Sequence, residues 1–295
     1  MTGLTGFRAR AVPASELLLY PELVWAGCNR CLPVLISRSG RTSEVIAVAE
    51  MLRKRNIPAL AITCGRGQPL ENLAEETIIL APADEQSTVM TRSFSSMLLA
   101  LQALAALLAG DSTFLDSLYR MPTLAAPVLQ PLPEKLCAFV SASRFAAYVY
   151  LGQGPFYGLA CEGALKVTEM SVSYAQSFHT LEFRHGPKSV VTPETLLFFL
   201  LSESSYQAEC EVLEEMKALG ATTLVVANRM DQRARGAADL AVELCLDVPE
   251  MARLAAYLFA GQLLGLYTGL EKGVDPDSPR NLSRVVLLDE EKIHL

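Results

Sequence analysis

Short apolar runs alternate along the chain with longer stretches in which apolar residues recur every three or four positions. Short runs of β-branched and apolar residues predict buried strands, and a period near 3.6 predicts amphipathic helices. The helical spacing is clear in residues 42–55, and the predicted strands are residues 33–37, 59–64, 77–81, 147–151, 196–201 and 222–227. This alternation predicts an α/β fold with parallel sheets flanked by helices in three layers.

A strand, turn, helix and second strand occur twice, at a constant offset of 165 residues without a gap. The offset superposes Ser37 on Ser202, Ser39 on Ser204, Glu44 on Glu209 and Met51 on Met216. Such self-similarity predicts a duplicated domain. Residues 121–134 contain four prolines and no clear helical pattern, which is typical of a linker. We therefore expect a first domain over residues 1–125 and a second over residues 126–295.

Composition narrows the class of protein. A chain of 295 residues with 51% hydrophobic and 19% charged residues can bury a core. Its formal net charge of -7 argues against binding to nucleic acid or to an anionic membrane surface, and favours a small ligand with a local basic pocket. The apolar runs are too short to span a bilayer. No nucleic-acid or membrane partner is expected.

Seven scattered cysteines are typical of reduced intracellular thiols, so a cytoplasmic location is expected. Cys28 and Cys31 form a CxxC match, but no second Cys or His pair completes a metal site, and we expect a loop with two free thiols. Gly152-Gln153-Gly154 lacks the third glycine of a dinucleotide fingerprint. Neither a metal nor a cofactor is expected.

The turn after the first predicted strand carries a Ser/Thr-rich sequence, Ser37-Arg38-Ser39-Gly40-Arg41-Thr42. A strand-to-helix turn offers main-chain amides and the positive end of a helix dipole, which suit a phosphate group. Its hydroxyls add donors, Gly40 permits close approach, and either Arg38 or Arg41 can add charge. Ser and Thr before a helix are also ordinary caps, and the pattern alone leaves the two interpretations balanced.

This loop resembles the S-x-S-G-x-T loop of the sugar isomerase (SIS) family, where it holds a sugar phosphate. Three later segments resemble the isomerase part of glucosamine-6-phosphate synthase and the amino-sugar-6-phosphate deaminases; they cover residues 163–169, 182–187 and 279–284. The resemblance implies two tandem SIS domains. It also implies that Ser37, Arg38, Ser39, Gly40 and Thr42 bind the phosphate.

Glu162, Lys166 and Glu169 stand at i, i+4 and i+7, which places them on one face of a helix. Spacing alone favours a solvated stripe of ion pairs. The resemblance instead implies a catalytic helix, in which Glu169 matches the proton-transferring glutamate and Glu162 and Lys166 match active-site residues. Interconversion of an aldose and a ketose needs such a base, which takes a proton from C2 and returns it to C1.

His185, in Arg184-His185-Gly186-Pro187, matches the histidine of the family that opens the sugar ring. Histidine titrates near neutral pH and can transfer a proton at the ring oxygen. In the family this residue reaches the site from the neighbouring subunit, so the resemblance implies a homodimer with shared active sites. His179 and His294 match no role.

Three departures from the family pattern shape the expected activity. No glutaminase segment precedes the first predicted strand, so we expect no use of glutamine. Arg284 replaces a lysine that can form a Schiff base, and we expect it to contact the open-chain sugar electrostatically. Residues 9–13 resemble the second strand of a SIS domain, so the first domain is expected to lack its N-terminal strand.

The expected function is that of an aldose–ketose isomerase/deaminase acting on an amino-sugar 6-phosphate such as glucosamine 6-phosphate. Two alternatives stay open. A non-catalytic phosphosugar sensor fits the missing strand, and a deglycase of a sugar–amine 6-phosphate conjugate would use much of the same machinery. The sequence does not choose between sugar epimers.

Overall fold

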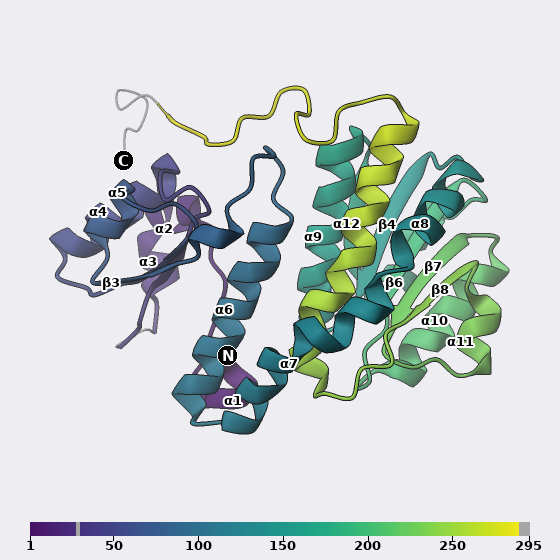
Figure 1. Cartoon of the computed structure of the whole chain (residues 1–295), viewed down its shortest axis with the longest axis horizontal. Helices are drawn as coiled ribbons and strands as arrows, with labels where there is room; N and C mark the ends of the chain where they lie inside the picture. The colour runs from purple at the N-terminus through teal and green to yellow at the C-terminus, as the bar shows by residue number, and fades with distance from the viewer. Residues whose placement is uncertain (28–29, 289–295) are drawn as a thin grey trace. The chain divides into compact units, whose positions relative to one another are not determined.

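The structure, a computed structural model, describes residues 1–27 and 30–288 and divides into two compact units. Unit 1 comprises Met1–Asp111 together with the C-terminal tail, Asn281–Leu295, and unit 2 comprises Ser112–Arg280. The expected division near residue 125 therefore falls inside unit 2, and the tail, expected in the second domain, belongs to unit 1. Figure 1 shows the chain in colour from one end to the other.

Unit 1 is built on a parallel sheet of three strands in the order β1-β2-β3. Helix α4 packs on one face through Val48 and Leu52, and α6 packs on the other, where Met97 meets Ile62. The elements are α1 (Thr2–Thr5), α2 (Ala14–Leu19), α3 (Pro21–Trp25), β1 (Val34–Ile36), α4 (Ser43–Lys54), β2 (Leu60–Thr63), α5 (Pro69–Leu73), β3 (Glu76–Ile79), η1 (Ala81–Ala83) and α6 (Arg92–Ala109).

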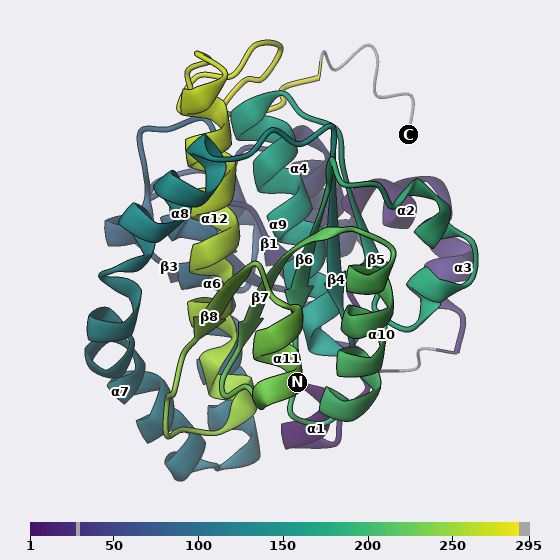
Figure 2. The same cartoon turned by 90° about the vertical axis from the view of Figure 1, so that its right-hand side faces the viewer.

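Unit 2 contains a parallel sheet of five strands in the order β5-β4-β6-β7-β8. Helices α9 and α12 cover one face, and α10 and α11 cover the other (Figures 1 and 2). The elements are α7 (Ser112–Leu129), α8 (Leu132–Ser141), β4 (Ala147–Gly152), α9 (Pro155–Ser171), β5 (Ala175–His179), η2 (Glu182–Arg184), η3 (Pro187–Val190), β6 (Thr195–Leu200), α10 (Tyr206–Ala218), β7 (Thr222–Ala227), α11 (Gln232–Ala237), β8 (Leu240–Glu243), η4 (Glu250–Arg253) and α12 (Leu254–Glu271).

The α/β fold class and all six predicted strands are confirmed, whereas β5 and β8 went unpredicted. The expected linker is wrong, because α7 runs through Pro122 and Pro127. Its buried residues include Phe114, Leu118 and Met121, so packing of an apolar stripe outweighs the helix-breaking tendency of the prolines.

Two expectations for the N-terminal region also need correction. Residues 9–13 form no strand, so β1 pairs only with β2 among the described residues. The expectation of free thiols in the CxxC motif is wrong for Cys31, which is disulfide-bonded. Cys28 lies outside the described residues. Five other cysteines, at positions 64, 137, 161, 210 and 245, are free.

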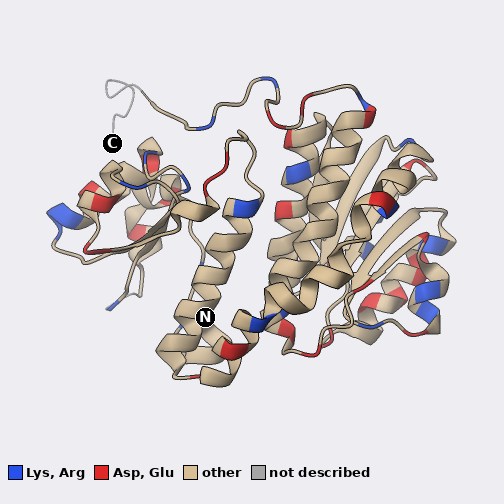
Figure 3. Ribbon diagram, in the orientation of Figure 1, with Lys and Arg blue, Asp and Glu red and all other residues tan. Residues whose placement is uncertain are grey.

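Helices α6 and α12 carry almost no charge along their lengths (Figure 3). Among the described helices, only α6 is long and apolar enough to cross a membrane by composition. This is weak evidence for a membrane span, because helices that pack on a core pass the same test.

Candidate active site

The candidate phosphate loop, residues 37–43, connects β1 to α4 in unit 1. Ser37 Oγ lies 3.1 Å from Thr42 Oγ1 and accepts a 3.2 Å hydrogen bond from the amide of Gly40. Ser39 Oγ accepts a bond from the amide of Arg41. The turn therefore brings together Ser37, Ser39, Gly40 and Thr42. The hydroxyls of the two serines and the threonine can rotate toward an anion.

Helix α4 begins at this loop without a side-chain cap, because Thr42 makes no capping hydrogen bond. The first amide, that of Ser43, donates to the carbonyl of Val286 in the C-terminal tail over 3.3 Å. The described residues offer no acceptor to the amides of Glu44 and Val45. Amides at the start of a helix attract anions, so the loop has the chemistry for a phosphate group.

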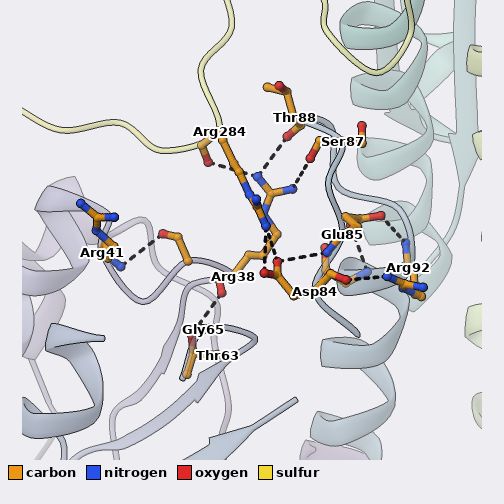
Figure 4. Close-up of polar contacts among 12 residues, drawn as sticks. Arg38, Arg41, Thr63, Gly65, Asp84, Glu85, Ser87, Thr88, Arg92 and Arg284 are labelled. Carbon is orange, nitrogen blue, oxygen red and sulfur yellow. Dashed lines mark hydrogen bonds and ion pairs between the residues drawn. The ribbon is translucent and has the colours of Figure 1, made fainter. Parts of the chain in front are cut away.

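Arg38 and Arg284, both expected to contact the substrate, bind groups of the protein in this structure. The side chain of Arg38 donates to three backbone carbonyls, and Arg284 pairs with the carboxylate of Asp84 (Figure 4). All these residues belong to unit 1. Arg38 thus contacts the backbone of Arg284, and the side chain of Arg284 contacts Asp84.

The second copy of the loop, between β6 and α10, is filled by the protein itself. Glu209 is fully buried, and its Oε2 accepts 2.8 Å bonds from both the amide and the hydroxyl of Ser202. Its Oε1 accepts from Thr180 Oγ1. Burial raises the pKa of Glu209, although these hydrogen bonds oppose the shift. A carboxylate thus occupies the position that an anion would take in this loop.

The three residues predicted to share one face of a helix do so on α9, where they form a chain of ion pairs in unit 2. Lys166 Nζ lies 3.3 Å from Glu162 Oε1 and 2.6 Å from Glu169 Oε2. The side chains of Lys166 and Glu162 are buried, whereas that of Glu169 is 21% exposed. The solvated stripe that spacing alone favoured is not formed, because of the two carboxylates only that of Glu169 is partly exposed.

Close packing fixes the position of α9. A Cβ atom at Gly265 of α12 would lie 2.9 Å from the carbonyl oxygen of Lys166, and one at Gly163 would lie 2.5 Å from the ring of Tyr150. These two glycines allow α9 to contact both α12 and the sheet. Buried charges are costly unless they are paired, so the rigid setting of Lys166 between two carboxylates is essential to this arrangement.

His185 follows η2 and is exposed, and among the described residues nothing pairs with its side chain. The structure therefore does not bring His185 into contact with Glu169. His179, at the end of β5, stacks on Tyr157 with ring centroids 3.9 Å apart. This contact accounts for His179 as a packing residue.

Two residues were missed by the sequence analysis: Glu209, which binds Ser202 in the second loop, and Asp84, which pairs with Arg284 in the tail. Ser202 and Glu209 both lie in the repeat, where the offset of 165 residues aligns them with Ser37 and Glu44. The repeat was therefore a sequence signal for Glu209. Asp84 gave no signal, because it is 200 residues from its partner Arg284.

Two parallel-sheet units, one with a Ser/Thr-rich strand-to-helix loop and one with buried ion pairs on a helix, place the chain in a class of tandem α/β proteins. Residues 30–107 and 147–265 match the SIS domain model. These two segments make up more than half of the chain. The protein belongs to the SIS domain family.

Known proteins resemble it along most of its length. It is 29% identical over 290 residues to a glutamine–fructose-6-phosphate aminotransferase (isomerizing) of Pyrobaculum aerophilum, covering 94% of this chain but 46% of that one. The chain thus spans about half the length of this curated relative.

Solved structures give a similar result. A glucosamine-6-phosphate deaminase of Thermotoga maritima superposes with a TM-score of 0.75 and 28% identity, covering 97% of this chain and 84% of that one. A tagatose-6-phosphate ketose/aldose isomerase of Escherichia coli gives 0.80 with 24% identity, over 94% and 78% of the two chains. The latter likeness concerns the fold.

Proposed function

We propose that this protein is an aldose–ketose isomerase/deaminase that converts an amino-sugar 6-phosphate, such as glucosamine 6-phosphate, into the ketose phosphate and ammonia. The observation that carries the proposal is the ion-pair chain on α9. It holds the Glu169 carboxylate 2.6 Å from a buried lysine while leaving it accessible. The name of the deaminase that this chain resembles supports the choice of substrate.

The chemistry uses the proton on C2 and a second proton on the C1 oxygen. Glu169 takes the proton from C2 of the open-chain amino sugar, the electron pair forms the C1–C2 double bond, and the C1 carbonyl oxygen takes a proton from water, which gives an enaminol. Return of the proton to C1 leaves an iminium group at C2. Water then adds to C2, and the C–N bond breaks to release ammonia and the ketose phosphate. A carboxylate held near the reacting carbon suits both transfers.

Lys166 and Glu162 act through Glu169. Lys166 is 1% exposed, so its charge is compensated by the two carboxylates beside it. This pairing keeps Glu169 in one orientation as its proton comes and goes. Loss of one partner from a buried ion pair is strongly destabilising, so variants of Lys166 test folding before they test catalysis.

The loop at residues 37–43 binds the phosphate, mainly through Ser37, Ser39 and Thr42 and the first amides of α4. His185 opens the sugar ring, and its exposure suits a role in a partner copy of the chain. The proposal therefore includes a homodimer with shared sites. We also propose a cytoplasmic enzyme, because its substrate is a charged metabolite.

Glu169→Gln is the test variant, because the amide keeps the shape of the side chain but cannot accept the proton. Purified protein is incubated with glucosamine 6-phosphate, and ammonia and fructose 6-phosphate are followed together. Loss of general base catalysis should slow both products about 10²- to 10⁴-fold. Glu194→Gln, at an exposed glutamate outside the site, is the matched control and should retain full activity.

Two results would contradict the proposal. Equal rates for Glu169→Gln and the control would remove Glu169 from the mechanism. Conversion of a plain phosphosugar, with no ammonia from any amino-sugar phosphate, would establish an isomerase that does not deaminate.

A further inference from the structure

Arg38 lies in the phosphate loop but directs its guanidinium away from the hydroxyls of that loop. Its Nη1 donates to the carbonyl of Ser87 over 3.2 Å, and its Nη2 donates to the carbonyls of Thr88 and Arg284, each over 3.1 Å. Arg38 is only 5% exposed. A buried guanidinium whose donors face carbonyls links segments of backbone to one another.

The segments that Arg38 joins are far apart in sequence. Ser87 and Thr88 belong to the loop between η1 and α6, whereas Arg284 belongs to the C-terminal tail. The loop is itself fixed by Glu85, which accepts hydrogen bonds from the amides and hydroxyls of Thr91 and Ser93 at the start of α6. The acceptors for Arg38 therefore stand on a rigid base.

Arg284 makes the second connection between the tail and this loop. Its Nη2 lies 2.8 Å from both Oδ1 and Oδ2 of Asp84 (Figure 4). Beyond Arg284 the tail runs past the start of α4, where Val286 accepts from the Ser43 amide and the Leu288 amide donates to Ser43 Oγ. The tail is thus held at the phosphate loop by side chains from two separate segments.

We propose that Arg38, Asp84 and Arg284 form a clamp that docks the C-terminal tail and the loop at residues 84–88 against the phosphate loop. Both arginines are then positioning residues, and the phosphate is left to the hydroxyls and amides. The role of the clamp in catalysis rests on the proposed function, but the docking of the tail does not. The clamp lies wholly within unit 1.

The two arginines contribute unequally. Arg38 makes three charge-assisted hydrogen bonds in a buried setting, and such bonds are roughly twice as strong as neutral ones. The Arg284–Asp84 pair is 44% and 40% exposed, so water and salt weaken it. Removal of the Arg38 guanidinium should therefore loosen the tail more than removal of the Asp84 charge.

Trypsin offers a direct measure of docking, because Arg284 is followed by Val285. Cleavage there requires the Arg284 side chain to leave Asp84 and its carbonyl to leave Arg38. When opening is fast, cleavage follows the population of the open tail. Limited digestion of the full chain, with release of the C-terminal fragment followed by mass spectrometry, compares wild type with Arg38→Met, Asp84→Asn and Arg41→Met.

We expect cleavage after Arg284 to be at least about tenfold faster in Arg38→Met and about twofold to fivefold faster in Asp84→Asn, in line with a strong buried and a weak exposed connection. Arg41→Met, at an exposed arginine of the same loop, is the matched control and should cleave at the wild-type rate. Cleavage after the exposed Arg8 is the internal reference. An unchanged rate in Arg38→Met would overturn the clamp, and Asp84→Asn carries the same test if Arg38→Met does not fold.

Binding of inorganic phosphate, measured by calorimetry on the same variants, separates positioning from direct contact. A positioning role predicts that Arg38→Met and Asp84→Asn each change the Kd for phosphate by less than about tenfold. A loss of affinity of more than about tenfold in Arg38→Met alone would make Arg38 a phosphate ligand and overturn its assignment. Neither assay uses a sugar, so failure of the proposed enzyme reaction leaves both results readable.

Discussion

The two copies of the strand–loop–helix unit have the same local geometry but different occupants. In each loop a serine hydroxyl accepts a hydrogen bond from the amide three residues later. The Gly40 amide donates to Ser37 Oγ over 3.2 Å, and the Ser205 amide donates to Ser202 Oγ over 3.0 Å. The second loop then adds Glu209, whose Oε2 lies 2.8 Å from both the amide nitrogen and the hydroxyl oxygen of Ser202. The first loop has no such internal anion among the described residues.

The two loops differ because the glutamate that occurs in both copies of the repeat binds the loop in only one of them. Glu44 is the counterpart of Glu209 in the repeat, but its Oε2 is buried without a hydrogen-bond partner among the described residues. It therefore does not fill its own loop. The same turn can hold either an anion from solution or a carboxylate of the chain, and the orientation of one side chain separates a binding site from a structural element.

The expected effect on ligand binding comes from closing the first loop at Gly40. This residue has a φ of 64°, and a Cβ there would lie 2.9 Å from Cβ of Gln68. A β-branched residue cannot adopt this backbone without strain. We expect Gly40→Val to weaken binding of inorganic phosphate at least about tenfold, equivalent to about 1.4 kcal/mol.

Ser205→Val is the matched control, because Ser205 is the counterpart of Gly40 and its φ of -118° suits a β-branched residue. Calorimetric titration with phosphate, after circular dichroism has verified folding, should show wild-type affinity for this variant. Equal losses in both variants would mean that phosphate does not distinguish the two loops.

The next effect concerns stability. Glu209→Ala leaves the buried Ser202 amide and the Thr180 hydroxyl without their acceptor. An unsatisfied buried polar group costs about 1–3 kcal/mol, so we expect a loss of that size in the free energy of unfolding of unit 2. Hydrogen exchange of the β6 and α10 amides measures it locally.

Glu44→Ala removes the counterpart in unit 1, where no hydrogen bond to the carboxylate Oε2 is lost. Its effect on the exchange of unit 1 amides should stay within about 0.5 kcal/mol. A larger loss in Glu44→Ala than in Glu209→Ala would reverse the roles assigned to the two glutamates.

The sequence was informative wherever a pattern is local. Central strands such as β6 and β7 are continuous apolar runs, and they were predicted; β5, with the sequence Ala-Gln-Ser-Phe-His, lies at a sheet edge and has too few apolar residues to stand out. The spacing of residues 162, 166 and 169 likewise predicted one helix face, which the ion pairs confirm. The close packing of α9 on α12 at Gly265 is a tertiary contact that no local pattern reveals.

Roles that depend on distant partners could not be predicted. The sequence assigned Arg38 and Arg284 to the substrate because their neighbours in the chain match family motifs. Both arginines instead bind groups of unit 1 that the fold brings to them, and Asp84 lies 200 residues from Arg284. The protein partner of each charged side chain depended on tertiary structure, which motif matching does not reveal.

The smallest expected effect is a dependence on pH, which tests whether Glu209 behaves as a buried anion. Burial raises the pKa of Glu209 above its usual value of 4.5, so the folded state binds more protons than the unfolded state at pH values just above 4.5. The contribution of this group to stability is therefore full below pH 4.5 and is lost as the pH rises through the folded pKa. Carboxylates such as Glu85, whose pKa is lowered by hydrogen bonds from Ser93 and Thr91 that outweigh its burial, give the opposite slope.

The difference between wild type and Glu209→Gln isolates this one group, because glutamine keeps an acceptor for Ser202 and does not titrate. Thermal unfolding from pH 4 to pH 8 should show the wild type losing stability relative to Glu209→Gln as the pH rises above 4.5. Parallel curves would mean that Glu209 titrates alike in the folded and unfolded states. The hydrogen bonds from Ser202 and Thr180 would then offset the whole effect of burial on the pKa of Glu209.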